Sequence, residues 1–446
     1  MTNKTNASLI TNIKIEKLFG HLRYDISSEQ EKERLLLLYG DNGAGKSTIL
    51  KLIFHLLSPE PYEGHRTAAS SIPFKKIVVT LSSGIVVSAE KEAPFDTKTY
   101  KLSMTRPGQA GDLIYIWERD KSGRDPETSD YTKYCEALSE SGIRFHFLSD
   151  NRRVEGMSEE SRQNLIRRHH LHHLHLSTAE REFSRYREIG EIPDTTEVLV
   201  NDAIERTLQW FQQQTLTGAN AGYTSVNAIY TELLRRIVET DDSNNANTGQ
   251  SASELQENLK DLNERNPQFS QYGLTPELDT EVLVSLLGKA KQNHAQILST
   301  ILQPYLDGHN ARLDALQPVQ NVINEFVTML ESFFSRKSIG LDVRNKMSIL
   351  SNDHKELRPS MLSSGEKQLV LLLCNAITAR NDGTIFIIDE PEISLNVKWQ
   401  RRLIQALLTC LDGVESQLVM ATHSIEILSQ YKEFVVPLND ISGNDQ

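Results

Sequence analysis

The sequence predicts an α/β fold in which a mixed β-sheet is built from two separated parts of the chain, with a large helical domain inserted between them. Strand-like runs dominate the first third of the chain, helical periodicity dominates the middle, and strand-like runs return in the last quarter. We therefore expect the two halves of the main domain over residues 1–154 and 338–446, and the inserted helical domain over residues 155–337.

The first half begins with predicted strands at residues 9–18 and 35–39. The second of these, LLLLY, is a continuous apolar run typical of the middle of a buried parallel sheet. A helix is predicted immediately afterwards, from Lys46 to about Leu57. Further strand-like runs follow between residues 74 and 148, separated by Gly, Pro and Asp.

The insertion has helical periodicity but lacks the sustained a/d heptads of a coiled coil. We therefore expect a compact helical lobe or a short hairpin rather than a long coiled-coil arm. Within it, residues 241–253 are small, polar and without periodicity, which predicts a mobile loop between helices.

The composition is that of a globular protein, with 38% hydrophobic and 24% charged residues among 446. The sequence contains no run of about 18 apolar residues that would span a bilayer, and its start lacks the features of a signal peptide. Cys135, Cys374 and Cys410 are unclustered, which argues against a disulfide framework or a zinc site and favours core thiols. These features predict a cytoplasmic protein without a membrane partner.

The formal net charge of −12 argues against a surface of positive potential, because non-specific DNA binding depends mainly on neutralising phosphates. A local basic groove is still compatible with this charge. The candidates for it are the pairs Arg152–Arg153, Arg167–Arg168 and Arg401–Arg402, each of which is otherwise a solvated helix face.

Residues 40–47, GDNGAGKS, match the pattern G-x-x-x-x-G-K-[ST] between a predicted strand and a predicted helix. The glycines let backbone N–H groups curl around a phosphate, and the following helix directs its positive end at the same place. Lys46 is expected to contact the β- and γ-phosphates of ATP, and Ser47 to offer its hydroxyl to Mg²⁺. The expected nucleotide-binding residues of this loop are Asn42, Gly43, Ala44, Gly45, Lys46, Ser47 and Thr48.

Two further segments lie in the last quarter of the chain. Residues 384–390, TIFIIDE, form an apolar run that ends in two carboxylates, the pattern of a Walker B strand. Asp389 is expected to hold Mg²⁺, and Glu390 to polarise the attacking water. Upstream, LSSGEKQ directly precedes a helical run, so Ser363 is predicted at or next to an N-cap, where exposed N–H groups form an anion site.

With these motifs in this order, the chain resembles ABC-class ATPases of the branch that includes SMC, RecF and OLD-type proteins. LSSGEKQ resembles the ABC signature, Ser394–Leu395 resembles the D-loop, and His423 resembles the switch histidine. The resemblance implies a P-loop ABC-type ATPase head with Glu390 and His423 as catalytic residues. It also implies that Ser363 and Gly365 contact ATP held by another head, in a head-to-head dimer or a higher homo-oligomer.

The Q-loop departs from the family pattern, and a histidine cluster is a separate candidate site. No clear Q-loop glutamine is present, and the positional candidates Asp150, Asn151 and Arg152 have the alternative interpretation of a simple turn. A group of histidines, with spacings of three and four that place some of them on one helical face, is either a metal site or a titratable surface strip. Its members are His169, His170, His172, His173 and His175.

The overall layout most resembles the stand-alone ATPase subunits of bacterial antiphage systems such as Septu and PARIS. That resemblance implies an ATPase that holds or releases a nuclease partner of HNH or TOPRIM type in trans, because no nuclease motif is found in this sequence. The alternative is a RecF- or SMC-like repair or recombination ATPase that binds DNA directly. A transporter subunit is disfavoured because an insertion of about 180 residues exceeds the short helical subdomain of transporter heads.

Overall fold

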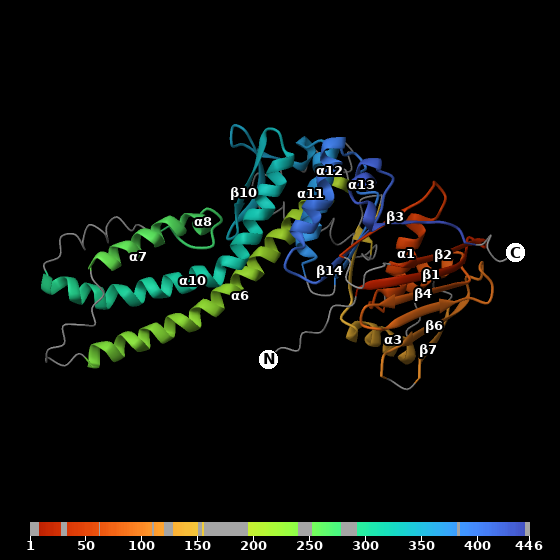
Figure 1. The fold of residues 1–446 in the computed structure, drawn as a ribbon, viewed down its shortest axis with the longest axis horizontal. Coiled ribbons are helices and arrows are strands. Elements are labelled where there is room, and N and C mark those ends of the chain that lie inside the picture. Colours follow the sequence, from red (N-terminus) through yellow and green to blue (C-terminus); the bar gives the residue numbers. More distant parts are fainter. Residues whose placement is uncertain are drawn as a thin grey trace, which may run out of the picture. The chain divides into compact units, whose positions relative to one another are not determined.

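The computed structural model describes residues 9–27, 34–61, 63–108, 111–119, 128–149, 154–155, 195–239, 252–277, 292–380 and 384–441. The chain divides into two compact units, Met1–Asn201 with Leu362–Gln446 in the first and Asp202–Met361 in the second. Both helices and strands are present in each unit, so the α/β class expected from the sequence is confirmed (Figure 1).

The first unit contains a mainly parallel sheet of six strands in the order β15-β3-β14-β13-β8-β9. Its strands are β3 (Leu35–Tyr39), β8 (Arg144–Leu148), β9 (Val154–Glu155), β13 (Thr384–Asp389), β14 (Ser416–Ala421) and β15 (Val435–Pro437). Every residue of β13 and β14 is buried, which is why these strands are apolar on both faces. The two separated parts of the chain therefore meet in one sheet, as predicted.

A second sheet of this unit is antiparallel, in the order β2-β1-β4-β5-β6-β7. Its strands are β1 (Ile10–Leu18), β2 (Leu22–Ser27), β4 (Lys76–Leu81), β5 (Val86–Glu90), β6 (Thr99–Thr105) and β7 (Leu113–Glu118). Helix α1 (Lys46–Leu57) shares one apolar core with strands of both sheets. The side-chain amide of Gln417 joins the sheets directly, because it both donates to and accepts from the backbone of Ile10, each at 2.9 Å.

The sequence reasoning did not identify β2, α2 (His65–Ser71) or α3 (Ser129–Glu140). Helix α3 begins after Thr128, whose side chain caps it by accepting from the N–H of Tyr131 at 3.3 Å. It buries Tyr131, Tyr134 and Leu138 completely or nearly so. The other helices described in this unit include α11 (Ser364–Thr378), α12 (Val397–Cys410) and α13 (Ile425–Gln430), with a short 3-10 turn at Lys432–Phe434. Another 3-10 turn, Pro359–Met361, lies at the end of the second unit.

Two buried cations lie at the carboxyl ends of helices in the first unit. Arg66 is 0% exposed and donates to the carbonyl oxygens of His55 and Ser58, the latter at 2.8 Å, where α1 ends. Lys91 is 1% exposed and donates to the carbonyl oxygens of Ser70 at 2.6 Å and Ile72 at 2.8 Å, where α2 ends. Each cation thus satisfies carbonyls that have no partner within a helix and lies at the negative end of its dipole.

The second unit is built on two long helices, α6 (Thr195–Glu239), of which the first turns belong to the first unit, and α10 (Gln292–Phe333). Helices α7 (Ala252–Arg265) and α8 (Pro267–Ser270) pack on α10. A small antiparallel sheet of β10 (Lys337–Asp342), β11 (Lys346–Ser351) and β12 (Glu356–Leu357) completes it. These strands, which the sequence analysis placed in the second half of the main domain, therefore belong to the unit of the long helices.

The expectation of a compact lobe or short hairpin is wrong, because α6 has 45 residues and α10 has 42. At 1.5 Å per residue these helices are roughly 65 Å long. They run antiparallel: Phe211 meets Phe326 with ring centroids 5.7 Å apart, and a Cβ on Gly218 would lie 3.0 Å from the carbonyl oxygen of Ala315 (Figure 1). Aromatic packing and a close approach at a glycine contribute to this pair, and neither requires a regular heptad.

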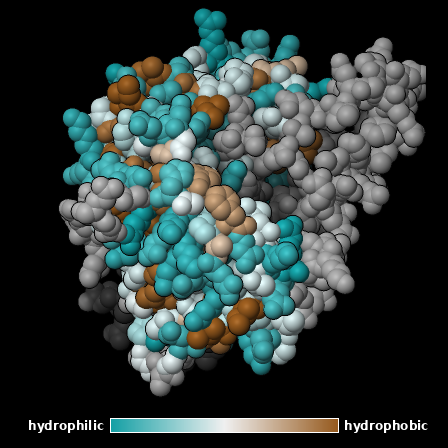
Figure 2. All heavy atoms as spheres, turned by 90° about the vertical axis from the view of Figure 1, so that its right-hand side faces the viewer, coloured by the Kyte–Doolittle hydropathy of each residue, from teal (hydrophilic) through white to brown (hydrophobic). Residues whose placement is uncertain are grey.

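Among the described residues, no helix is long and apolar enough to cross a membrane. On the face drawn in Figure 2, hydrophobic residues form small separate groups among hydrophilic ones. The three cysteines are buried and unbonded, as expected for core thiols. The expected loop at 241–253 lies almost wholly outside the described residues, and only its last two residues belong to α7.

Candidate nucleotide-binding site

Three neighbouring parallel strands bring the predicted motifs to one edge of the parallel sheet. β14 lies between β3 and β13 and pairs in parallel with both. The loops that follow their carboxyl ends therefore lie side by side, and they carry the phosphate loop after β3, Glu390 after β13 and His423 after β14 (Figure 1). Ligands of open α/β sheets bind at this edge.

The phosphate loop has the left-handed turns that its glycines predict. Gly43 and Gly45 have φ values of 89° and 83°, which glycine adopts without the cost that a side chain brings. A Cβ on Gly45 would also lie 2.9 Å from Leu18, so the β1–β2 turn supports the loop from behind. Tyr24 of β2 adds a hydrogen bond of 2.9 Å from its hydroxyl to the carbonyl oxygen of Ala44.

Lys46 is the first residue of α1 and is only 6% exposed. Its Nζ donates to the carbonyl oxygens of Gly40 at 2.7 Å and Asp41 at 3.2 Å. Burial lowers the pKa of Lys46, and the nearby charges of Glu390 and Asp389 oppose that shift. A buried ammonium at a helix N-terminus, with uncapped N–H groups beside it, has the chemistry of a phosphate site.

The other expected residues of the loop lie on its rim and in the first turn of α1. Asn42 is exposed, whereas Ser47 and Thr48 are half-buried. Asp389, at the end of β13, is 2% exposed, and its charge reaches Lys46. A hydroxyl and a carboxylate beside a phosphate site suit Mg²⁺, which keeps water and phosphate oxygens as its other ligands. In the part of the chain that the structure describes, no group of three or more His, Cys, Asp or Glu could hold a metal by itself.

Glu390 and His423 face each other across the edge of the sheet. Glu390 Oε1 lies 3.8 Å from His423 Nε2, and the side chains are 33% and 36% exposed. The N–H of Glu390 donates to the carbonyl oxygen of Ala421 at 2.9 Å, and its φ of +48° turns the chain sharply after the strand. Outside glycine such a backbone is uncommon and occurs often at functional sites.

The signature segment begins α11 with a capping box. Ser363 Oγ accepts from the N–H of Glu366 at 3.3 Å, and the Glu366 carboxylate accepts from the N–H of Ser363 at 2.8 Å. Ser363 is exposed, while Leu362 beside it is 5% exposed. The predicted N-cap is therefore confirmed, and its hydroxyl and helix terminus face outward.

Gly365 is buried against the segment that resembles the D-loop. A Cβ at this position would lie 2.7 Å from the carbonyl oxygen of Ser394 and 3.1 Å from Trp399 Cζ3. Ser394 itself has a φ of +67°, and Leu395 is 6% exposed. The signature and the turn after β13 are thus in direct contact within one chain.

Sequence reasoning missed one residue of this site, Glu392. Its Oε1 accepts hydrogen bonds from Thr422 Oγ1 at 2.7 Å, from the N–H of His423 at 2.6 Å and from the N–H of Ser424 at 3.1 Å. The available signal was a third carboxylate in DEPE, two residues after Glu390 and beyond a proline.

Several residues that the sequence analysis proposed as candidates are not part of the site in the described structure. Asp150, Asn151, Arg152 and the histidines at 169–175 lie outside the described residues. Arg401 is bound to Glu426, with Nε 2.7 Å from Oε2, and this partner raises the pKa of the guanidinium.

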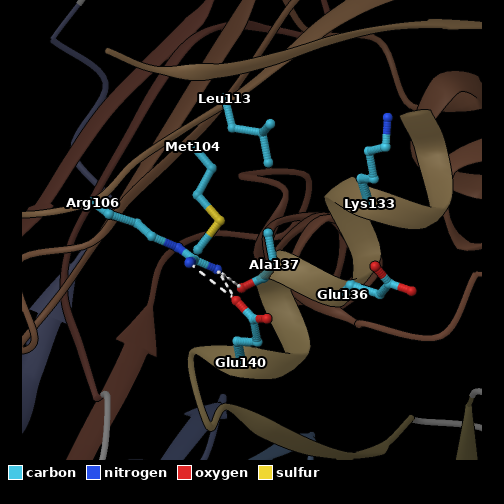
Figure 3. Close-up of a pocket in the computed structure, with 7 residues that line it drawn as sticks. All are labelled: Met104, Arg106, Leu113, Lys133, Glu136, Ala137 and Glu140. Carbon is cyan, nitrogen blue, oxygen red and sulfur yellow. Dashed lines mark hydrogen bonds and ion pairs between the residues drawn. The ribbon is translucent and has the colours of Figure 1, made fainter. Parts of the chain in front are cut away.

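A pocket of about 290 Å³ lies between β6, β7 and α3 (Figure 3). The guanidinium of Arg106 there is held by Glu140 at 3.1 Å and by the carbonyl oxygen of Ala137 at 2.5 Å. Its charge is therefore already paired, and the pocket offers no comparable anion site.

The chain is similar to known proteins at the level of its family. The sequence model of one family, described as AAA ATPase domain, matches residues 10–428. UvrABC system protein A of Mycoplasma genitalium is 29% identical over 130 residues, which are 27% of this chain and 13% of that protein. The chain thus spans about an eighth of the length of this relative.

Two solved structures resemble the chain over most of its length. The Smc head domain with an extended coiled coil bound to the C-terminal domain of ScpA, from Pyrococcus furiosus, is 11% identical with a TM-score of 0.38, covering 95% of this chain and 92% of that chain. The Smc head domain with a coiled coil and joint from Pyrococcus yayanosii is 15% identical with a TM-score of 0.36, covering 95% and 93%.

Proposed function

Because the chain belongs to the AAA ATPase domain family, we propose that it binds ATP with Mg²⁺ and hydrolyses it at a site completed by the signature segment of a second copy. The observation that carries this proposal is the outward-facing Ser363. Its hydroxyl and backbone are bonded to its own helix, and the helix terminus that it caps is exposed. The exposed start of α11, on a head that already has a phosphate loop, is suited to contact nucleotide held by another head.

Each residue of the site has a role that follows from its position. Lys46 and the N–H groups of the loop bind the phosphates, since a buried ammonium gains most from an anion. Ser47 and Asp389 hold Mg²⁺, which offsets the charge of the phosphate oxygens. Glu390 orients and polarises the attacking water, and His423, 3.8 Å away, contacts the γ-phosphate.

Exposed apolar side chains near the motifs support self-association. Met361 precedes the signature, Val397 follows the D-loop segment and Ile425 follows the switch loop, and they are 61%, 50% and 79% exposed. Ser424 Oγ donates to Gln400 Oε1 at 2.8 Å, so α12 and α13, which carry Val397 and Ile425, are in contact. Burying these side chains against a second head stabilises the pair. The proposed assembly is a head-to-head dimer or a higher homo-oligomer.

The test compares Lys46→Ala and Glu390→Gln with the parental protein. Lys46→Ala should lose ATP binding, whereas Glu390→Gln should bind ATP, hydrolyse it at least about 100-fold more slowly and accumulate as a dimer in light scattering. Exposed Glu433→Gln is the matched control. Hydrolysis by Glu390→Gln at the parental rate would show that another group activates the water.

Mixing experiments address the shared site. Ser363→Arg places a large side chain at the exposed N-cap of α11, so it should inactivate the site of the partner rather than its own. Added to a parental protein, it should lower activity per parental subunit. Unchanged activity in the mixture, or full activity of an isolated monomer, would contradict a site made from two copies.

At a finer level, we propose that the ATPase belongs to an antiphage complex and controls a partner nuclease of HNH or TOPRIM type. The support is the layout of FGHLRYDI, FLSDNRR and IIDEPEISLNVKWQRRL around a helical insertion. Co-purification of the tagged protein with its neighbouring gene product, with and without ATP, tests this. A stable complex with a nuclease supports the proposal, and an ATPase that co-purifies with no other protein contradicts it.

A repair or recombination ATPase that binds DNA directly is the second candidate, favoured by the match to UvrABC system protein A. Three cations on β1, β2 and β4 give it little support, because each is paired: Lys14 with Asp25 at 3.3 Å, Arg23 with Glu16 at 3.9 Å and Lys76 with Glu90 at 3.1 Å. Hydrolysis that rises on adding DNA, and falls again with salt, would favour this candidate.

A further inference from the structure

We propose that Glu392 is a positioning residue that fixes the loop carrying His423 to the turn after β13, and so holds the imidazole beside Glu390 for hydrolysis. This inference rests on the proposed ATPase function. Glu392 touches neither the water nor the phosphates in this role, and it acts through the two residues that do.

The contacts are unusually concentrated on one atom. Glu392 Oε1 accepts from one hydroxyl and two successive backbone N–H groups, at distances between 2.6 and 3.1 Å. Ser424 N–H also donates to Thr422 Oγ1 at 3.0 Å, so the loop of Thr422, His423 and Ser424 closes around the carboxylate. Hydrogen bonds to an ionised acceptor are about twice as strong as neutral ones.

The anchored loop is where rigidity matters for the chemistry. His423 projects from the middle of the three-residue loop, and Ser424 at its end is the N-cap of α13, accepting from the N–H of Ile427 at 3.3 Å. Losing the carboxylate would leave the N–H of His423 without this acceptor and the N–H of Ser424 with Thr422 Oγ1 alone, and the loop would move to satisfy them. A displacement of about 1 Å in a catalytic group costs on the order of 100-fold in rate.

The same carboxylate also faces the phosphate site. Its charge is one of four that act on Lys46, after Glu390, Asp389 and Asp41. Glu392 Oε2 is buried without a hydrogen-bond partner among the described residues, so this oxygen is an acceptor still available near the site. A purely structural anchor would not need a charged group with an unused oxygen beside a phosphate loop.

Glu392 further connects the loop of His423 to the signature. The turn that begins at Glu390 is closed by the N–H of Leu395 donating to the carbonyl oxygen of Glu392 at 3.0 Å. Ser394, within that turn, packs its carbonyl against Gly365. The turn that contains Glu392 therefore contacts both the His423 loop and the signature.

The experiment uses Glu392→Ala and the conservative Glu392→Gln in the full chain, with Glu433→Ala as the exposed control. Hydrogen exchange of the peptide 416–430 reads the anchor without requiring hydrolysis. We expect exchange at His423 and Ser424 to be at least about tenfold faster in Glu392→Ala. The amide of Glu392→Gln retains an acceptor oxygen and should restore much of the protection.

Steady-state kinetics and ATP-analogue binding test the positioning role. Glu392→Ala should lower kcat by about 10- to 100-fold while the Kd for a fluorescent ATP analogue changes less than about threefold, and Glu392→Gln should recover part of kcat. Unchanged hydrogen exchange at His423 and Ser424 in Glu392→Ala would overturn the anchoring role. An equal loss of protection in Glu433→Ala would overturn it as well. If the parental protein has no ATPase activity, both the proposed function and this role are overturned. If the parent is active and Glu392→Ala has the same kcat, only the positioning role is overturned.

Discussion

Replacing Gly365 with alanine tests the contact between the signature and the turn after β13. The added Cβ would lie 2.7 Å from a backbone oxygen, that of Ser394, and 3.1 Å from the ring of Trp399. A carbonyl oxygen in a turn cannot rotate away as a flexible side chain does, so α11 or the turn must shift by about 0.5 Å or more. Overpacking of this kind costs about 1–3 kcal/mol, against a helix-propensity gain of up to about 1 kcal/mol for alanine over glycine.

We therefore expect the free energy of unfolding of Gly365→Ala to fall by about 1–2 kcal/mol in urea denaturation, and its ATPase activity to fall with it. Ser364→Ala is the matched control, because it changes the adjacent, exposed position of the same helical turn. A Gly365→Ala protein that is as stable as the parent and fully active would refute the reasoning, since it would show that the backbone accommodates a Cβ there without consequence.

Three other outcomes are expected. Burial, and to a lesser extent Arg66, lower the pKa of His65 to about 3, so only the unfolded chain takes up this proton as the pH falls from about 6.5. The free energy of unfolding should lose about 2 kcal/mol between pH 7 and pH 5 relative to His65→Gln, and equal losses in both proteins would contradict a neutral buried imidazole. Burial lowers the pKa of Lys91 to about 8, and a group that is harder to protonate when folded contributes stability as the pH rises. Between pH 8 and 9.5 the parent should therefore gain roughly 1.5 kcal/mol relative to Lys91→Met in the same measurement, and no gain would mean that the carbonyl acceptors of the ammonium fully compensate for its burial. Ile425→Asp should weaken the ATP-bound Glu390→Gln dimer about tenfold in sedimentation, whereas Ile116→Asp, on an equally apolar and 62% exposed residue of β7, should leave it unchanged.

The edge of the parallel sheet and its motifs are the part of this protein that the sequence predicts. The run LLLLY predicts β3 with its bounds, and the helix predicted from Lys46 is α1 as observed. Both follow from local rules: a strand buried on both faces must be apolar throughout, and a phosphate loop needs glycines before a lysine. The position of Glu390 follows from TIFIIDE for the same reason.

The elements that were missed depend on contacts between distant residues. Helix α3 is buried through Tyr131, Tyr134 and Leu138, whose spacing is helical, but the Thr, Lys and Glu between them obscure the apolar stripe. The length of the helix pair is hard to predict from the sequence because glycine is unfavourable inside a helix. In the structure Gly218 lies within α6, where it allows close approach to the carbonyl oxygen of Ala315 in α10. Glu392 is recognisable only once Thr422–Ser424 is brought to it across the sheet, about 30 residues later in the chain.

The contacts of the first unit also give the signature helix a connection to the long helices that does not depend on residues 150–153. Lys367, three residues into α11, lies 3.5 Å from Glu197 in the first turn of α6, and the side chains are 12% and 30% exposed. A partly buried pair holds its geometry better than a surface pair does, because fewer waters compete for either charge. Gly365, on the same turn of α11, contacts Ser394, and the turn of Ser394 is tied through Glu392 to His423. One helix therefore touches the nucleotide edge at its N-terminus and the start of a 45-residue helix one turn later. The ion pair therefore joins the signature helix to the first turn of α6 within the first unit.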